Sequence, residues 1–246
     1  MVVAGAGGHA LEILDLLQDL GEVNTLFFYG NKVGRSRIQD RYTVVHTLED
    51  IKTIFQSTPE FIIGIGNPEE RFEVYQKFND LGGQLEFIQG SNAKISRSAK
   101  VEGVDIFNFC HVGGEVQIGK GCLINTGSQI HHEVRIGEFS VVSPRAILLG
   151  ACQVGDFCNI GANATILPGI RIGHRVTIGA GAVIIQDVED EELVVGVPGM
   201  VICRRSSVSS QSFNPQLTTD TTDNLQPISV SHLDDRRDSI DLTSID

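Results

Sequence analysis

The sequence predicts an α/β domain at the N-terminus followed by a parallel β-helix. Two observations predict this order. Predicted strands and helices alternate through residues 1–90, and from Ile106 to Ile184 an aliphatic residue occupies every sixth position. Alternating strands and helices are typical of a parallel sheet covered by helices, whereas a short fixed period indicates a stacked repeat.

Four strands and three helices are expected in the first domain. The predicted strands are residues 2–4, 26–29, 61–65 and 84–88, and the predicted helices are residues 9–20, 48–56 and 68–81. Residues 91–105 lead into the repeat. We therefore place a boundary between a domain of residues 1–90 and a β-helix of residues 91–203.

The repeat is unbroken over fourteen successive positions. They are Ile106, Val112, Ile118, Ile124, Ile130, Ile136, Val142, Leu148, Val154, Ile160, Ile166, Ile172, Ile178 and Ile184. A period of six fits neither an amphipathic helix nor one isolated strand, but it fits a β-helix in which every sixth side chain points into a shared interior. The residue four places later is nearly always small or β-branched, as a narrow interior requires. Glycine often follows the aliphatic residue directly, and we expect these glycines to form corners with positive φ.

Composition excludes several classes of function. The formal net charge of −12 argues against a surface for nucleic acid or anionic membranes. Four of the five cysteines share the small interior register of the repeat, which predicts packing rather than disulfide or metal chemistry. We see no apolar run of membrane-spanning length and no secretory signal in MVVAGAGGHALEIL, so a cytoplasmic protein without a metal is expected.

Two glycine-rich loops follow predicted strands in the first domain. The first runs from Gly5 to Ala10 and opens a helix, and the second begins at Gly64. Small residues and a helix N-terminus favour a bound phosphate. No acidic residue ends the second strand, so a nucleotide sugar is expected in preference to NAD; a tight turn without a ligand is the alternative. The candidate sugar-nucleotide residues are Gly7, Gly8, His9, Asn31, Lys32, Gly66 and Asn67.

One predicted corner of the repeat carries His131, His132 and Glu133. Acyl transfer from a thioester needs a base with a pKa near neutrality, and histidine has one without a large shift. A neighbouring carboxylate can fix the tautomer of the ring. A solvated histidine on a turn is the alternative that the residues alone leave open.

Five motifs identify a family. They are GAGGHALEILDLL, GIGNPEERF, INTGSQIHHEVRIGEFS, GANATILPGIRIG and GAGAVIIQDVEDEELVVGVPGMVICRR. Over residues 1–203 the chain resembles the sugar acyltransferases of the hexapeptide-repeat superfamily. Its group contains sialic acid O-acetyltransferases and N-acetyltransferases of nucleotide-linked 4-amino sugars.

The resemblance implies a Rossmann-like domain that binds a sugar nucleotide, a left-handed β-helix, and a homotrimer with active sites between neighbours. It places the catalytic base at His132 and its acid at Glu133, with Asn125 facing the sugar. Acetyl-CoA is expected to lie along the β-helix and to serve as the acyl donor. Its implied contacts are Gly150, Gly161, Ala162, Gly179, Ala180 and Gly181. The sugar nitrogen or oxygen then attacks the thioester directly, without a covalent enzyme intermediate.

Two residues depart from the family pattern. Val141 replaces a second histidine near the thioester, which weakens the assignment as an N-acetyltransferase. Arg145 replaces a usual glycine beside the cofactor groove. The first hypothesis is an N-acetyltransferase for UDP-, dTDP- or GDP-linked amino sugars in surface glycan synthesis. The alternatives are an O-acetyltransferase for sialic acid or a related sugar, and a non-catalytic binding subunit.

The C-terminal stretch, residues 204–246, lacks the repeat. From residue 206 it holds fourteen Ser or Thr and seven Asp but no Gly or Lys. Such a composition buries too little apolar area to offset chain entropy, so a disordered acidic tail is expected.

Overall fold

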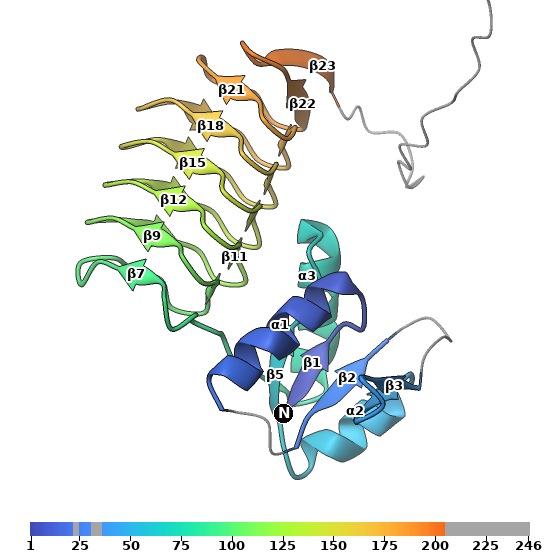
Figure 1. Cartoon of the computed structure of the whole chain (residues 1–246). Coiled ribbons are helices and arrows are strands. Elements are labelled where there is room, and N and C mark those ends of the chain that lie inside the picture. Colours follow the sequence, from blue (N-terminus) through green and yellow to red (C-terminus); the bar gives the residue numbers. More distant parts are fainter. Residues whose placement is uncertain (22–24, 31–35, 205–246) are drawn as a thin grey trace, which may run out of the picture. The chain divides into compact units, whose positions relative to one another are not determined.

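The structure is a computed structural model that describes residues 1–21, 25–30 and 36–204 (Figure 1). The predicted tail thus lies outside the described residues except for its first residue, Arg204. Within them, the predicted fold class, an α/β domain followed by a parallel β-helix, is confirmed.

The N-terminal domain is built on a six-stranded sheet in the order β3-β4-β2-β1-β5-β6. All neighbouring strands are parallel except β3 and β4, which form an antiparallel pair that the sequence did not predict. The chain runs from the central strand β1 to β2 on one side, and later to β5 on the other. The elements are β1 (Val2–Ala4), α1 (Gly8–Asp19), β2 (Phe27–Tyr29), β3 (Arg37–Ile38), β4 (Tyr42–Val45), α2 (Leu48–Phe55), β5 (Glu60–Ile63), α3 (Pro68–Asp80) and β6 (Gln84–Leu85).

Helices pack on both faces of this sheet because successive strand residues point to opposite sides. Val3 belongs to a buried cluster with Ile13 of α1. Its neighbour Val2 belongs to a second cluster with Phe78 of α3 and Ile51 of α2. The sheet domain is therefore a three-layer arrangement, with α1 on one face and α2 and α3 on the other.

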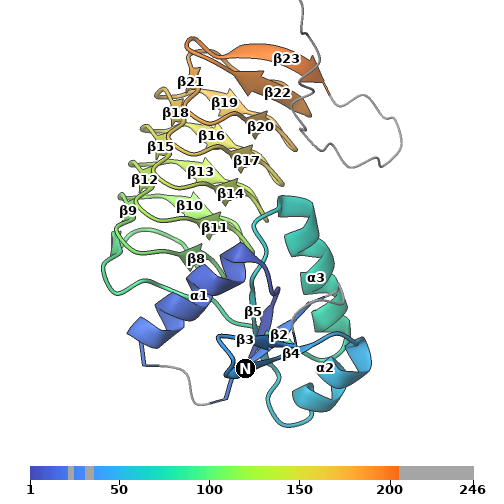
Figure 2. The ribbon, with the colours of Figure 1, turned by 45° about the vertical axis from the view of Figure 1, so that its right-hand side comes forward.

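The hexapeptides fold into three stacked parallel sheets (Figure 2). Each hexapeptide contributes one two-residue strand, and three of them make a coil of eighteen residues, so that Ile124 pairs with Val142 and Val142 with Ile160. The first face comprises β8 (Asp105–Ile106), β11 (Leu123–Ile124), β14 (Val141–Val142), β17 (Asn159–Ile160) and β20 (Thr177–Ile178). The second comprises β7 (Lys94–Ile95), β9 (His111–Val112), β12 (Gln129–Ile130), β15 (Ile147–Leu148), β18 (Thr165–Ile166) and β21 (Val183–Ile184). The third comprises β10 (Gln117–Ile118), β13 (Arg135–Ile136), β16 (Gln153–Val154) and β19 (Arg171–Ile172).

The interior of the β-helix contains all fourteen predicted aliphatic side chains, and none of them is more than 7% exposed. The second inward position is narrower and holds Ser128, Ser140 and four cysteines. Burial raises the pKa of Cys122 and Cys152 to about 12, so these thiols stay protonated at neutral pH. The interior cysteines therefore act as small packing residues, as the register predicted.

The predicted role of the glycines at the corners is wrong in one respect. Glycines directly after the aliphatic residue do not have positive φ. The residue with positive φ is instead the third one after the aliphatic residue, and it is often not glycine, as at Glu133 and Arg145. The earlier glycines are needed because neighbouring coils approach closely: a Cβ on Gly161 would lie 2.5 Å from the amide nitrogen of Ala180.

Outward side chains of the β-helix extend the two clusters of the sheet domain. Phe107, Leu123 and Val141 join the cluster that contains α1. Phe72 of α3 contacts Phe139 at a ring-centroid distance of 5.0 Å. The first face is therefore buried against the sheet domain in the coils at the N-terminal end of the β-helix.

Two longer strands close the β-helix. β22 (Glu192–Val195) pairs parallel with β20, and β23 (Met200–Arg204) returns antiparallel beside β22. In the described part of the chain, no helix has the length and apolar character needed to cross a bilayer.

Candidate active site

His132 lies where the chain turns from the second face to the third, here named the second corner. It follows Ile130 of β12, which points inward, and its own side chain is 67% exposed. Its Nδ1 lies 3.0 Å from Oε2 of Glu133. Glu133 occupies the left-handed position of this corner, with φ of 61°. The pair combines an imidazole with a carboxylate that can hold its Nδ1 proton.

Gly150 occupies the same corner position one coil later and makes room for the imidazole. A Cβ on Gly150 would lie 2.4 Å from Cε1 and 2.5 Å from Nε2 of His132. Any larger residue would displace the ring. Glu133 contacts one nitrogen of the imidazole and Gly150 faces the other, so Nε2 is the atom left available to a substrate.

The other predicted cofactor residues lie at the first corner, where the chain turns from the first face to the second. They occupy two adjacent coils at this corner and are Gly161, Ala162, Gly179, Ala180 and Gly181. Three of their amides are occupied, since those of Gly161, Gly179 and Gly181 donate to carbonyls of adjoining coils at 2.8 Å.

Three predicted cofactor residues keep unpaired amides. The backbone N–H groups of Gly150, Ala162 and Ala180 have no acceptor among the described residues. All three are the second residue after an inward aliphatic position. An unpaired amide thus occurs at the same position of three corners. It depends on backbone geometry, so the residue types in the sequence did not predict it.

Asn125 also lies at the first corner and is 9% exposed. Its Oδ1 accepts a hydrogen bond of 2.6 Å from the amide of Thr126, so the carboxamide is held in one orientation. One chain therefore places His132, Glu133 and Gly150 at one corner, and Asn125 with the remaining cofactor residues at another. The second face separates the two sets.

The two glycine loops meet at the carboxyl ends of β1 and β5. These strands are neighbours from which the chain crosses in opposite directions, the place where α/β sheets form a ligand crevice. The loops touch, since a Cβ on Gly5 would lie 2.3 Å from the carbonyl oxygen of Gly64. Gly7, Gly8 and Gly66 are exposed.

Asn67 has a structural role that the sequence analysis missed. Its side chain accepts from the amide of Glu70 at 3.0 Å and caps α3, whose first turn also carries Glu69. Acidic residues there disfavour an anion, so α1, which has no side-chain cap and no acid in its first turn, offers the better anion-binding end. Asn31 and Lys32 lie outside the described residues.

His9 is held between the two domains. Its ring stacks on Phe107 at a centroid distance of 5.3 Å, and its Nδ1 lies 3.0 Å from Oε2 of Glu12. Burial lowers the pKa of His9 below its usual value, with Glu12 acting in the opposite direction. Its Nε2 is buried and has no hydrogen-bond partner among the described residues.

The two departures from the family pattern lie in different surroundings. Val141 is 4% exposed and packs in the cluster shared with α1. Arg145 is exposed at the first corner, one coil after Asn125, and its Cγ would lie 3.3 Å from a Cβ on Gly127. The hydrophobic side chain at 141 therefore belongs to the domain contact, whereas the cation at 145 reaches the surface.

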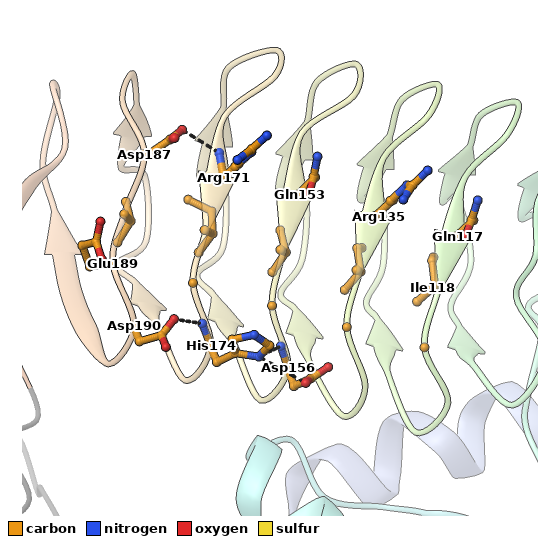
Figure 3. A pocket seen from close by; sticks show the side chains of 18 of the residues that line it. Gln117, Ile118, Arg135, Gln153, Asp156, Arg171, His174, Asp187, Glu189 and Asp190 are labelled. Carbon is orange, nitrogen blue, oxygen red and sulfur yellow. Dashed lines mark hydrogen bonds and ion pairs between the residues drawn. The ribbon is translucent and has the colours of Figure 1, made fainter.

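The third face carries a shallow groove of about 810 Å³ (Figure 3). Gln117, Arg135, Gln153 and Arg171 form a row along it. On its other edge, Asp190 accepts from the amide of His174 at 2.8 Å, so acidic side chains cap the turns of adjacent coils. None of the predicted site residues lines this groove. This groove is therefore separate from the candidate active site.

Comparisons with known proteins agree with both parts of the fold. Residues 1–78 match the PglD N-terminal domain, and residues 151–186 match the bacterial transferase hexapeptide family of six repeats. The acetyltransferase domain of PglB from Neisseria gonorrhoeae FA1090 is 26% identical with a TM-score of 0.75, over 82% of this chain and 98% of that chain.

A perosamine N-acetyltransferase from Caulobacter crescentus is 27% identical with a TM-score of 0.75, over 81% of this chain and 95% of that chain. WeeI from Acinetobacter baumannii AYE, at 21% identity and a TM-score of 0.60, shares the fold. The chain is therefore similar to hexapeptide-repeat sugar acyltransferases in both of its parts, since its N-terminal domain matches that of PglD and its β-helix contains hexapeptide repeats of the bacterial transferase type.

Proposed function

We propose that this enzyme transfers the acetyl group of acetyl-CoA to the amino group of a nucleotide-linked sugar. The relatives support the substrate classes: the PglB domain was solved with acetyl coenzyme A, and the perosamine enzyme with CoA and GDP-perosamine. The observation that carries the proposal is the His132–Glu133 pair, in which Glu133 contacts Nδ1 while Nε2 has no hydrogen-bond partner in the part of the chain that the structure describes.

The proposed reaction is a single acyl transfer. The sugar amine attacks the thioester carbonyl carbon while Nε2 of His132 accepts a proton from the amine. Glu133 stabilises the imidazolium that forms. The unpaired amide of Gly150, the residue that packs against the ring, is proposed to donate to the oxyanion. Collapse of the intermediate breaks the C–S bond, and the proton passes to the departing CoA thiolate.

Acetyl-CoA is proposed to lie along the first corner. The unpaired amides of Ala162 and Ala180 are one coil apart there and offer donors to the polar groups of an extended cofactor. Asn125 is placed at the same corner, two coils before Ala162, to face the sugar. The glycine loops of the sheet domain are proposed to bind the diphosphate at the N-terminus of α1.

A homotrimer is proposed because one chain does not complete this site. The base lies at the second corner and the cofactor residues lie at the first, on either side of the second face. A ring in which the second corner of one protomer meets the first corner of the next brings the two sets together three times.

Thiol release from acetyl-CoA tests the reaction. UDP-, dTDP- and GDP-linked 4-amino sugars are compared with free sialic acids, and the matching nucleotide 4-hydroxy sugars serve as controls. Turnover confined to an amino sugar is the expected result. Turnover of the 4-hydroxy sugars alone would contradict N-acetylation.

A second candidate function is O-acetylation of a sialic acid or a related sugar. Val141 favours it, because the resemblance associates a histidine at this position with N-acetyltransferases. Turnover of free sialic acids in the same assay would establish it. If no sugar is turned over while acetyl-CoA binds, the chain is a binding subunit and both enzymatic proposals fail.

A further inference from the structure

Arg71 is a fully buried arginine that bonds to both domains. From α3, its Nε donates to the carbonyl oxygen of Gly121 at 2.9 Å and its Nη2 to Oδ2 of Asp105 at 2.8 Å. Its Nη1 donates to the carbonyl oxygens of Ile63 and Ile65 at 3.2 and 2.8 Å. One guanidinium therefore joins the end of β5 to two successive coils of the β-helix.

Asp105 completes this joint on the β-helix side. It is 4% exposed and directly precedes the inward residue Ile106 of β8. While Oδ2 accepts from Arg71, Oδ1 accepts from the amide of Ile88 at 3.2 Å. Both ions are thus buried, paired and hydrogen-bonded, the condition under which a buried charge is tolerated.

The joint bears directly on the glycine loops. Ile63 and Ile65 flank Gly64, and Gly64 is the residue against which Gly5 packs. The two carbonyls that Arg71 holds therefore fix the segment on which both loops rest. A shift of this segment would move the loops relative to the β-helix.

Cohesion between the domains does not depend on this ion pair. Phe72 contacts Phe139 and Phe157 at 5.0 and 5.4 Å, and apolar clusters extend across the contact. Replacing a buried ion pair with apolar residues of similar size is often neutral or stabilising. The directional bonds of Arg71 instead specify how the domains are aligned.

We propose that Arg71, paired with Asp105, is a positioning residue that sets the sugar-nucleotide loops against the coils of the β-helix. The inference depends on the proposed function, since it assumes that the loops carry the sugar nucleotide. A misplacement of about 1 Å between reacting groups can cost about 10²-fold in rate, so alignment of the two domains matters for transfer.

The decisive variant is Arg71→Met combined with Asp105→Leu, which removes both charges and leaves no buried ion unpaired. We expect cooperative unfolding at a moderately lower temperature, because the carbonyl oxygens that Arg71 held and the amide of Ile88 lose their partners. We expect an unchanged Kd for acetyl-CoA. We expect kcat/KM for the nucleotide sugar to fall by about 10²-fold. A double variant that is as stable and as active as the wild type would overturn the proposal.

Two further variants separate positioning from simple destabilisation. Asp105→Asn keeps one acceptor oxygen, which can serve Arg71 or Ile88 but not both, and it removes the charge that pairs with Arg71. We therefore expect a loss in the same direction, together with lower stability. Arg175→Gln removes a surface pair between α3 and the β-helix, in which Nη1 lies 3.7 Å from Oε1 of Glu69. This control should match the wild type in all three measurements. An equal loss of sugar-nucleotide and acetyl-CoA affinity in the double variant would contradict a role confined to the loops.

The proposed function is tested separately, because it fails when the wild-type enzyme turns over no sugar. Calorimetric titration with the nucleotide sugar, in the absence of acetyl-CoA, gives the Kd of the wild-type and double-variant proteins. This Kd reports the alignment of the loops without turnover. A weaker Kd in the double variant supports the proposal, and an unchanged Kd with unchanged KM overturns it.

Discussion

His132 is positioned by a contact on each side of its ring. Glu133 holds Nδ1 from the same corner, and the absence of a side chain on Gly150 leaves space for Cε1 and Nε2. His131, by contrast, precedes this arrangement and lies near His111, at a ring-centroid distance of 6.4 Å. Adjacent histidines in the sequence thus have different surroundings, which gives two predictions at the scale of single residues.

Replacement of His132 by alanine should lower kcat by about 10²- to 10⁴-fold, because the general base is lost. The Kd for acetyl-CoA should be nearly unchanged, since the unpaired amides that are proposed to bind the cofactor remain. His131→Ala is the matched control and should retain most of the activity. Steady-state kinetics and calorimetry of both variants check this, and a reversed order of effects would show that the base is His131.

Gly150→Ala should displace the imidazole, because the added methyl group would occupy its place. We expect a loss in kcat of about 10²-fold, typical of a misplaced catalytic group, with little change in melting temperature. Gly114→Ala is the control: it lies at the same corner position one coil before His132, and its Cβ would meet Ser98 Oγ at an ordinary 3.4 Å. Equal kinetics for the two variants would contradict the steric argument.

At the scale of elements, much of the fold follows from local pattern. The run from Ile106 to Ile184 predicts the interior because an aliphatic residue recurs at every sixth position, and each of these side chains is buried. The sequence did not predict the short pair β3 and β4, since Arg37–Ile38 is too brief to show alternation. It also placed positive φ at the wrong corner residue, because Glu133 and Arg145 are left-handed without being glycine.

The candidate site was predicted less completely than the fold. The histidine and its acid are visible as residue types, whereas an unpaired amide at Ala162 depends on backbone geometry alone. Arg71 was hidden for another reason: a charged residue within a polar helix gives no sign of burial until the packing of α3 is known. Contacts between distant segments therefore account for most of what sequence patterns omit.

The junction of α1 with the β-helix should make stability depend on pH through His9. The pKa of His9 is lowered from its ordinary value of 6.5 mainly because burial penalises the imidazolium, while Glu12 raises it, Arg71 lowers it and Asp105 raises it. The unfolded chain then binds more protons than the folded chain. Neutral His9 therefore contributes its full share of folding stability above pH 6.5, the ordinary pKa of histidine. This share is lost as the pH falls through the lower pKa of the folded protein.

His9→Gln should remove this dependence while preserving a polar side chain of similar reach. Urea unfolding from about pH 7.5 to about pH 5.5 should show a steeper loss of stability in the wild type, by at most about 1.4 kcal/mol per pH unit. The slopes are compared, because the substitution also changes absolute stability. Identical slopes would mean that another group controls the acid response.

At the scale of the whole molecule, the proposed site is divided between two corners of the β-helix that one chain keeps apart. This division predicts that two inactive variants restore activity when they share an oligomer. His132→Ala removes the base at the second corner, and Ala162→Tyr blocks the cofactor at the first. Each homo-oligomer should be inactive.

Co-expression of these variants should yield mixed trimers in which one junction joins an intact second corner to an intact first corner. One of the three junctions in each mixed trimer is restored, so purified mixed trimers should show about a third of the wild-type kcat per site. Differently tagged subunits allow the mixed species to be purified. Mixed oligomers without activity would show that each chain supplies its own complete site.

The buried thiols of the β-helix interior provide a way to follow how the β-helix opens. Cys110, Cys122, Cys152 and Cys158 are buried in its interior, whereas Cys203 is exposed on the closing strand. A thiol reagent should therefore modify one cysteine rapidly in the native protein and the other four only when coils separate. Mass spectrometry of the labelled peptides would time that separation coil by coil, so the sequence already contains a set of unfolding probes that need no engineering.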